Sequence, residues 1–236
     1  MQAARHDMIG VCCTTAGALV VPTGGRTSML GTNPLAFAAP AGRCRPFMLD
    51  MATSVAPIGK VEVKVRRETP LPAGWAIDGQ GQPTTDSRAV LERAFGDMTG
   101  GLLPLGGAEA GHKGYGLAAM VDILAGVLAS AQVSLHVREA MERNEGAGVG
   151  HFVAAIDLAA FGPVQDFKDA MDAYINDLHA APRAPGTERI LVAGEPEFDA
   201  AERHEREGIP LHRGVASSLQ ALGRELGVSP FQELSE

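Results

Sequence analysis

The stretch Gly111-His112-Lys113-Gly114-Tyr115-Gly116-Leu117 leads into the most apolar segment of the chain. Glycines at this spacing allow a backbone to approach a ligand closely or to adopt a positive φ. We interpret the stretch as a glycine-rich loop before a helix, whose first N–H groups and dipole would favour an anion. Lys113 would add a full positive charge. The alternative is a tight loop that only lets the helix pack, with His112 and Lys113 in solvent.

Two common nucleotide-binding motifs can be tested against this stretch. A Walker A loop needs Gly-Lys-Ser/Thr, whereas Lys113 is followed by Gly114, so that motif is excluded. The residues from Gly114 to Ala119 match the dinucleotide pattern G-x-G-x-x-A, but this pattern is meaningful only between a strand and a helix. The preceding residues 100–111 include no β-branched residue. The sequence therefore argues against a Rossmann fold.

The segment after the stretch is predicted to be a central packing helix. Its larger apolar residues recur at helical spacing, and small residues on another face would allow close contact. The predicted apolar stripe consists of Leu117, Met120, Val121, Leu124, Val127, Leu128 and Ala131, and the small residues are Ala118, Ala125 and Gly126. The segment contains Asp122 and is shorter than the roughly 20 apolar residues of a membrane span. We therefore predict a buried helix and no membrane contact.

Composition and charge are those of a folded globular protein. The chain has 236 residues, of which 45% are hydrophobic and 20% charged, enough for one large core or two smaller ones. Its net charge of -8 comes from scattered acidic residues, which excludes the basic surface that nucleic acid binding needs. The cysteines Cys12, Cys13 and Cys44 form no C-x-x-C pair, so neither a disulfide framework nor a metal site is expected. With no apolar targeting segment in the first residues, these features favour the cytoplasm.

Short apolar runs bounded by turn residues predict several strands. They cover residues 8–13, 18–22, 35–39, 46–50 and 151–157. Residues 61–66 alternate apolar and charged side chains with period 2, which fits a half-exposed strand or the edge of a helix, and their valines favour the strand. The prolines and glycines of residues 69–86 predict a loop with a turn at Asp78-Gly79.

Helices are predicted at residues 87–95, at 166–178 and at the end of the chain. The second has an apolar stripe, and its acidic residues are expected to form a solvated face; these are Asp166, Asp169, Asp172 and Asp177. Residues 189–197 are predicted to be extended, and Val215, Leu219, Leu222 and Leu226 define the final helix. Strands come first and are then mixed with helices without regular βαβ alternation. This order predicts an α+β fold with a mixed or antiparallel sheet.

A set of short motifs spans nearly the whole chain in a fixed order. They are Gly31-Thr32-Asn33-Pro34, Leu49-Asp50-Met51-Ala52-Thr53-Ser54, Gly59-Lys60, Thr84-Thr85-Asp86, Leu103-Pro104-Leu105-Gly106, the stretch 111–117, Gly150-His151-Phe152 and Gly194-Glu195-Pro196. With these motifs the chain resembles the second type of malate/L-lactate dehydrogenases, a family that includes relatives acting on ureidoglycolate, sulfolactate and cyclic imino acids. The resemblance implies an oxidoreductase that uses NAD or NADP to interconvert a small 2-hydroxy acid and its 2-oxo acid. It also implies a non-Rossmann α+β cofactor domain, here residues 1–200, a helical domain that would include residues 201–236, and a homodimer.

The resemblance also assigns roles to residues within these motifs. The cofactor would contact Thr15, Ala16, Asp50, Met51, Ala52, Gly194 and Glu195, and the substrate would contact Thr32, Gly59 and Lys113. Each assignment has a structural alternative. Thr32 and Asn33 could simply build the turn before Pro34, Asp50 could cap the following segment, and Glu195 could only pair with Arg189. His151 is expected to be an ordinary packed histidine.

The chain also departs from the family pattern. Family members usually begin with a helical region that carries a Ser and His pair and a nearby Arg, which supply proton transfer and carboxylate binding, and these residues are missing here. Hydride transfer to a carbonyl needs a proton donor within hydrogen-bond reach. The catalytic residue is therefore unknown, with His112 as a remote substitute. We expect an N-terminally truncated dehydrogenase that exposes apolar surface and associates; the alternative is a noncatalytic remnant that binds nucleotide or pairs with a full-length subunit.

Overall fold

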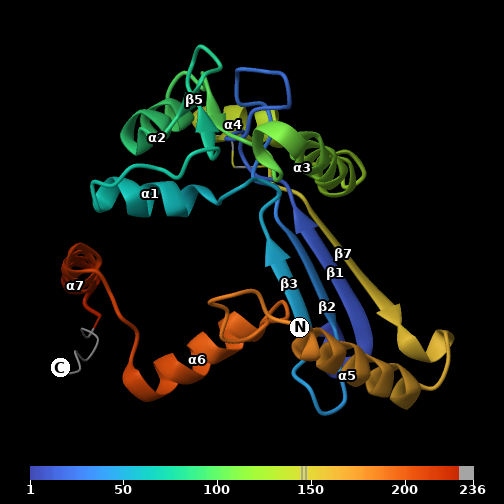
Figure 1. The fold of residues 1–236 in the computed structure, drawn as a ribbon. Coiled ribbons are helices and arrows are strands. Elements are labelled where there is room, and N and C mark those ends of the chain that lie inside the picture. Colours follow the sequence, from blue (N-terminus) through green and yellow to red (C-terminus); the bar gives the residue numbers. More distant parts are fainter. Residues whose placement is uncertain (145, 147, 229–236) are drawn as a thin grey trace.

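A four-stranded antiparallel sheet forms the middle of the molecule (Figure 1). The computed structural model describes residues 1–144, 146 and 148–228. The strands β1 (Met8–Thr14), β2 (Leu35–Ala39), β3 (Phe47–Met51) and β7 (His151–Asp157) lie in the order β3-β2-β1-β7, and every neighbouring pair is antiparallel. Together with the surrounding helices this confirms the α+β class. The predicted strand at residues 18–22 is reduced to isolated bridges from Val20 to Leu30 and Leu102.

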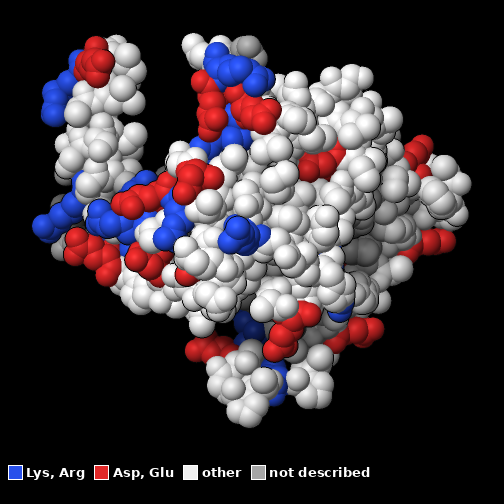
Figure 2. Space-filling view, turned by 90° about the horizontal axis from the view of Figure 1, so that it is seen from above, with Lys and Arg blue, Asp and Glu red and all other residues white. Residues whose placement is uncertain are grey.

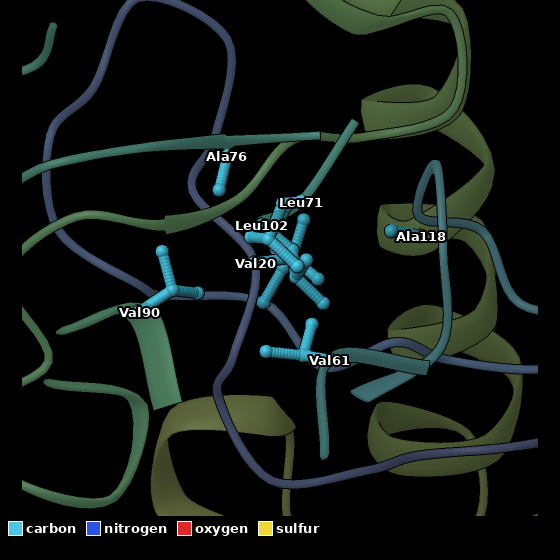
Figure 3. Close-up of a cluster of buried hydrophobic side chains, with 8 residues drawn as sticks. Val20, Val61, Leu71, Ala76, Val90, Leu102 and Ala118 are labelled. Atoms are coloured by element: carbon cyan, nitrogen blue, oxygen red, sulfur yellow. The ribbon is translucent and has the colours of Figure 1, made fainter. Parts of the chain in front are cut away.

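A second, smaller sheet and its helices gather at one end of the first sheet (Figure 1). The two-residue strands β4 (Ala76–Ile77), β5 (Pro83–Thr84) and β6 (Gly101–Leu102) lie in the order β5-β4-β6, and the helices α1 (Ile58–Arg66) and α2 (Ser87–Phe95) share their core. Their core is drawn in Figure 3 and consists of Val20, Leu30, Val61, Leu71, Ala76, Val90, Leu102 and Ala118. Residues 69–86 are thus not all loop, although the predicted turn is confirmed by Asp78, which accepts from Gln80 N and Gln82 N.

Helix α1 corrects the prediction of a strand at residues 61–66. Alternation would have placed Val61 and Val63 on one face, but Val61 is fully buried in the core and Val63 is 40% exposed. Ile58 packs against the same core one helical turn before Val61. Burial of these two side chains on one helical stripe therefore outweighs the local preference of valine for strands.

The glycine-rich stretch is helical, which corrects the interpretation as a loop. It lies inside α3 (Gly107–Val121), and the one irregular residue is Ala110 at φ -121°. Gly114 N donates to Leu105 O at 3.1 Å, outside the helix. A Cβ on Gly114 would lie 2.5 Å from Leu105 O and 2.7 Å from Leu105 Cα. Glycine here allows the helix to lie directly against the backbone of the preceding turn.

The buried face of the central helix is the face of small residues. The helix continues from α3 into the π-helical segment η2 (Asp122–Val127). Val121 and Ala125 are fully buried and pack against Cys13 of β1. The predicted apolar stripe is wrong in its second half, because Val127 and Leu128 are 65% and 66% exposed. Seen from above, the region over α3 carries few charged side chains (Figure 2).

Helices α4 (Ser134–Glu142) and α5 (Val164–Ala180) follow, the latter across the far end of the large sheet (Figure 1). One of the acidic residues expected in solvent, Asp172, is buried. Its carboxylate accepts from Gly42 N at 3.0 Å, Arg43 N at 2.7 Å and Cys44 N at 3.0 Å, between β2 and β3. These N–H groups, that of Arg43 first, lower the pKa of Asp172 to about 2. The short 3-10 helices η1 (Ala3–His6) and η3 (Leu158–Ala160) precede β1 and follow β7.

The last part of the chain forms an arm of two helices. Residues 189–194 contain no strand, and α6 (Glu195–Glu207) begins where the extended segment was expected to end. Arg45 fixes α6 to the β2–β3 connection through ion pairs with Asp199 at 2.7 Å and with Glu202. The predicted final helix is α7 (Arg213–Leu226), which stands away from the sheets with exposed leucines (Figures 1 and 2). The proposed domain division at residue 200 falls inside α6 and stays a prediction. No described helix is long and apolar enough to cross a membrane.

Candidate cofactor and substrate site

A buried polar network joins the end of the large sheet to α3. At its centre is Asn33, which is fully buried and has φ +34°. Its Oδ1 accepts from Ala16 N at 3.0 Å, and its Nδ2 donates to Ala118 O at 2.9 Å and to Ser134 Oγ at 3.2 Å. Asparagine tolerates this left-handed conformation better than most residues. The buried side chain of Asn33 therefore fixes the turn before Pro34 from the interior of the protein.

Thr32 is held in place by backbone contacts on both sides. Thr53 N and Thr53 Oγ1 donate to Thr32 O at 2.9 and 3.0 Å. On the other side, a Cβ on Gly31 would overlap the carbonyl group of Ala16, so only glycine allows this approach. The structure thus brings three of the predicted positions together, namely Ala16, Thr32 and the Ala52–Thr53 step. The turn-building alternative for Thr32 and Asn33 applies as well, because the same residues form the turn.

The start of β7 belongs to this group. Thr15 N donates to Gly150 O at 3.1 Å, and Gly150 N donates to Thr15 Oγ1 at 3.0 Å. Thr15 is buried, so its hydroxyl serves the fold. His151 pairs with Thr14 across the sheet and is exposed, which corrects its expected packing in the interior. Sequence reasoning missed this imidazole, because a histidine at a strand end gives no local signal of its exposure.

One face of the large sheet carries a hollow lined by small residues. The register places Asp50, Ala36, Cys12 and Val153 in one row across β3, β2, β1 and β7. The neighbouring row on the same face is Met48, Ala38, Gly10 and Ala155. These rows and η1 line a cavity of about 690 Å³. The small side chains leave a flat apolar floor with one carboxylate at its edge.

Asp50 is that carboxylate. It is exposed and makes no hydrogen bond or ion pair with any described residue, so it does not cap the following segment. Met51 pairs with Leu35 next to the Thr32 turn, and Ala52 leads into Thr53. A free carboxylate can accept hydrogen bonds from hydroxyl groups of a ligand.

The remaining predicted substrate and proton-transfer residues lie near the starts of two helices. Gly59 lies in the first turn of α1, where Pro57 is the N-cap, no side chain caps the helix and no acidic residue is present. Ile58 N and Gly59 N therefore have no intrahelical acceptor, which favours an anion. His112 and Lys113 are exposed near the start of α3 and have no partner among the described residues. The link from α3 to Thr53 runs through Leu105, whose N donates to Thr53 O at 2.9 Å.

Gly194 and Glu195 lie at the other end of β3. Gly194 has φ +96°, and a Cβ there would lie 2.9 Å from Met48 Cβ, a residue that lines the cavity. Glu195 is turned toward α5, where its carboxylate lies 2.9 Å from His179 Nε2 and accepts from Val192 N at 2.8 Å. Burial opposes its ionisation, but Val192 N and His179 hold the pKa of Glu195 below its ordinary value. The expected alternative partner, Arg189, forms its ion pair with Asp199.

The fold and this group of residues define a class: an antiparallel α+β domain with a cavity on one face of the sheet and a buried polar turn at the end of the sheet. The model of the malate/L-lactate dehydrogenase family matches residues 1–220, and the chain belongs to this family.

Relatives of known name agree with this assignment. The malate dehydrogenase of Pyrococcus abyssi is 43% identical over 235 residues, which cover 98% of this chain and 62% of that protein. The delta(1)-pyrroline-2-carboxylate reductase of Ancylobacter novellus is 38% identical over 91% of this chain and 57% of its own length. The crystal structure of malate dehydrogenase from Entamoeba histolytica superposes with a TM-score of 0.93 at 32% identity, over 98% of this chain and 64% of that one. The chain thus spans about three fifths of the length of these relatives.

Proposed function

We propose that this chain is the cofactor-binding part of an oxidoreductase that uses NAD or NADP to interconvert a small 2-hydroxy acid, similar to malate or lactate, and its 2-oxo acid. The observation that carries the proposal is the unpartnered carboxylate of Asp50 at the edge of the cavity on the sheet. Family membership and the names of the relatives support the reaction type. The cyclic imino acid of the Ancylobacter relative differs in chemistry from malate, so the individual acid is left open.

The residues present fit a nicotinamide dinucleotide. The open part of the floor, at Cys12, Ala36 and Ala155, would accept the flat face of a ring, and Asp50 would accept a hydrogen bond from a ribose hydroxyl. Met51 and Ala52 would line the same site, with Thr15, Ala16 and the Gly194–Glu195 turn at its ends. When bound, the nicotinamide supplies or receives the hydride.

The substrate would lie beside the Thr32 turn. Thr32 Oγ1 can donate to a carbonyl or carboxylate, the free N–H groups near Gly59 favour an anion, and Lys113 can neutralise its charge. His112 is the candidate of this chain for proton transfer to the carbonyl oxygen. In this arrangement the chain's own residues orient the acid against the sheet.

We also infer a homodimer and a cytoplasmic location. The exposed apolar side chains Met120, Ile123, Val127 and Leu128 on the central helix support an association, because such patches commonly mark interfaces. The three unpaired cysteines support a reducing compartment.

Nucleotide binding by the purified chain is the test. NADH and NADPH fluorescence titrations should show saturable binding, and Asp50→Asn should weaken it about tenfold, as expected for a hydrogen bond to a charged acceptor. The matched control is Asp177→Asn, an exposed carboxylate on α5, which should bind like the unchanged chain. Absence of binding by both nucleotides would contradict the proposal.

Turnover separates the two versions of the function. The dehydrogenase version predicts NADH or NADPH oxidation with oxaloacetate, pyruvate or a cyclic imino acid. Binding without turnover of any of these would instead support a noncatalytic remnant that binds nucleotide or pairs with a full-length subunit. Reconstitution with a full-length relative would then reveal whether the chain pairs.

A further inference from the structure

We propose that Ser134 and Asp122 are positioning residues, which hold the Thr32 turn against α3 by acting through the buried amide of Asn33. Neither residue belongs to a motif in which ligand contacts were expected, and Ser134 lies 101 positions from Asn33 in the sequence. The inference deepens the proposed function, and it rests on that function only for its activity measurement.

The amide of Asn33 uses both of its N–H groups and its carbonyl oxygen. The oxygen accepts from Ala16 N, and the N–H groups go to Ala118 O and Ser134 Oγ. Asn33 is fully buried, so water cannot replace a lost partner. Removal of one bond therefore leaves an unpaired polar group directly under Thr32.

Asp122 determines how the Ser134 hydroxyl is oriented. A carboxylate can only accept, and its two oxygens lie 2.9 and 2.7 Å from Ser134 Oγ. The hydroxyl proton therefore goes to Asp122, which leaves a lone pair on Ser134 Oγ for Nδ2 of Asn33. Asp122 Oδ1 also accepts from Ser134 N at 3.2 Å, at the start of α4, where a negative charge is favourable.

These contacts coincide with a change of helical register. The other partner of Ala118 O is Asp122 N, and Asp122 begins the π-helical segment η2. Such segments are frequently found at functional sites. The network thus joins the turn before β2, the end of α3 and the start of α4 at one point. Loss of the Ser134 hydroxyl or of the Asp122 charge would let the turn shift against α3.

The hydrogen exchange of two backbone amides reports directly on the position of the Thr32 turn. Ala16 N donates to Asn33 Oδ1, and Thr53 N donates to Thr32 O. Hydrogen exchange of the full chain should be about tenfold faster at both amides in Ser134→Ala and in Asp122→Asn. Ser28→Ala is the matched control, because Ser28 is equally buried and donates to Gly100 O at 2.8 Å, outside the network. It should leave both rates unchanged.

The activity measurement separates positioning from general destabilisation. In steady-state reduction of oxaloacetate by NADH, both variants should raise the KM for oxaloacetate about tenfold and leave the KM for NADH within about twofold. The inference would be overturned if the amides of Ala16 and Thr53 exchanged at the same rate in all three variants, Ser134→Ala, Asp122→Asn and Ser28→Ala. An inactive unchanged chain would count against the proposed function alone, since the exchange comparison still decides the inference.

Discussion

Two glycines of α3, only two positions apart, should respond to alanine in opposite directions. A Cβ on Gly116 would meet nothing within 4 Å, whereas a Cβ on Gly114 would lie 2.5 Å from Leu105 O and 2.7 Å from Leu105 Cα. Alanine inside a helix is more favourable than glycine by about 0.8–1 kcal/mol. Gly116→Ala gains this preference at no steric cost. In Gly114→Ala the new atom meets backbone, which cannot rotate away.

The size of each effect follows from these contacts. Gly116→Ala should raise the free energy of unfolding by about 0.5–1 kcal/mol, which corresponds to a Tm increase of roughly 1–4 °C. Gly114→Ala must separate α3 from the preceding turn, at the roughly 1–3 kcal/mol of an overpacked core. It also weakens the hydrogen bond from Gly114 N to Leu105 O, worth about 1 kcal/mol. After the helix preference of alanine is subtracted, the net loss should be about 1–3 kcal/mol.

Urea unfolding followed by circular dichroism measures both variants. Gly111→Ala is a useful intermediate, because its Cβ would lie 3.5 Å from Thr23 Oγ1, an ordinary contact distance. Its stability should be close to that of the unchanged chain or slightly higher. If Gly114→Ala proved as stable as Gly116→Ala, the close approach of α3 to Leu105 would be refuted, and the glycine-rich stretch would instead be a flexible loop.

Three further predictions concern other parts of the molecule. Val61→Thr should destabilise the chain by about 1–3 kcal/mol by burying a hydroxyl, while Val63→Thr should change little; equal effects in urea unfolding would favour a strand over α1. The lowered pKa of Asp172 stabilises the fold fully above the ordinary value of 3.8, and this contribution should disappear as the pH falls through about 2. Unfolding of Asp172→Asn should therefore show less acid dependence than that of the unchanged chain, and parallel pH profiles would disprove the role of this carboxylate. Finally, the double variant Ile123→Lys/Leu128→Lys should associate less than the unchanged chain, as measured by sedimentation velocity. If the unchanged chain is a monodisperse monomer at micromolar concentration, the expected interface is contradicted.

The Asp172 carboxylate also holds together the end of the large sheet where β2 connects to β3. One carboxylate satisfies three consecutive N–H groups of the β2–β3 connection, and Arg45 of the same connection holds α6. The arm that carries Gly194 is thereby fixed beside β3.

The sequence by itself determined the elements whose signals are local. The helix at 87–95 and the strand at 151–157 have the predicted bounds, because each is delimited by neighbours with strong preferences. Asp86 accepts from Ala89 N and caps the first, and Asp157 accepts from Ala159 N just after the second. The ordered motifs likewise sufficed to predict the family and the α+β class.

The tertiary structure decided everything that depends on which surfaces meet. Residues 61–66 became a helix because one stripe of α1 could be buried against the small sheet, and the glycine-rich stretch became helical because α3 lies directly on the backbone at Leu105. The small residues Ala118, Ala125 and Gly126 of the central helix are buried, whereas Val127 and Leu128 are exposed, since close contact with β1 favours small side chains. The Asn33, Ser134 and Asp122 network could not be predicted, because its members are far apart in sequence and become partners only after the chain has folded.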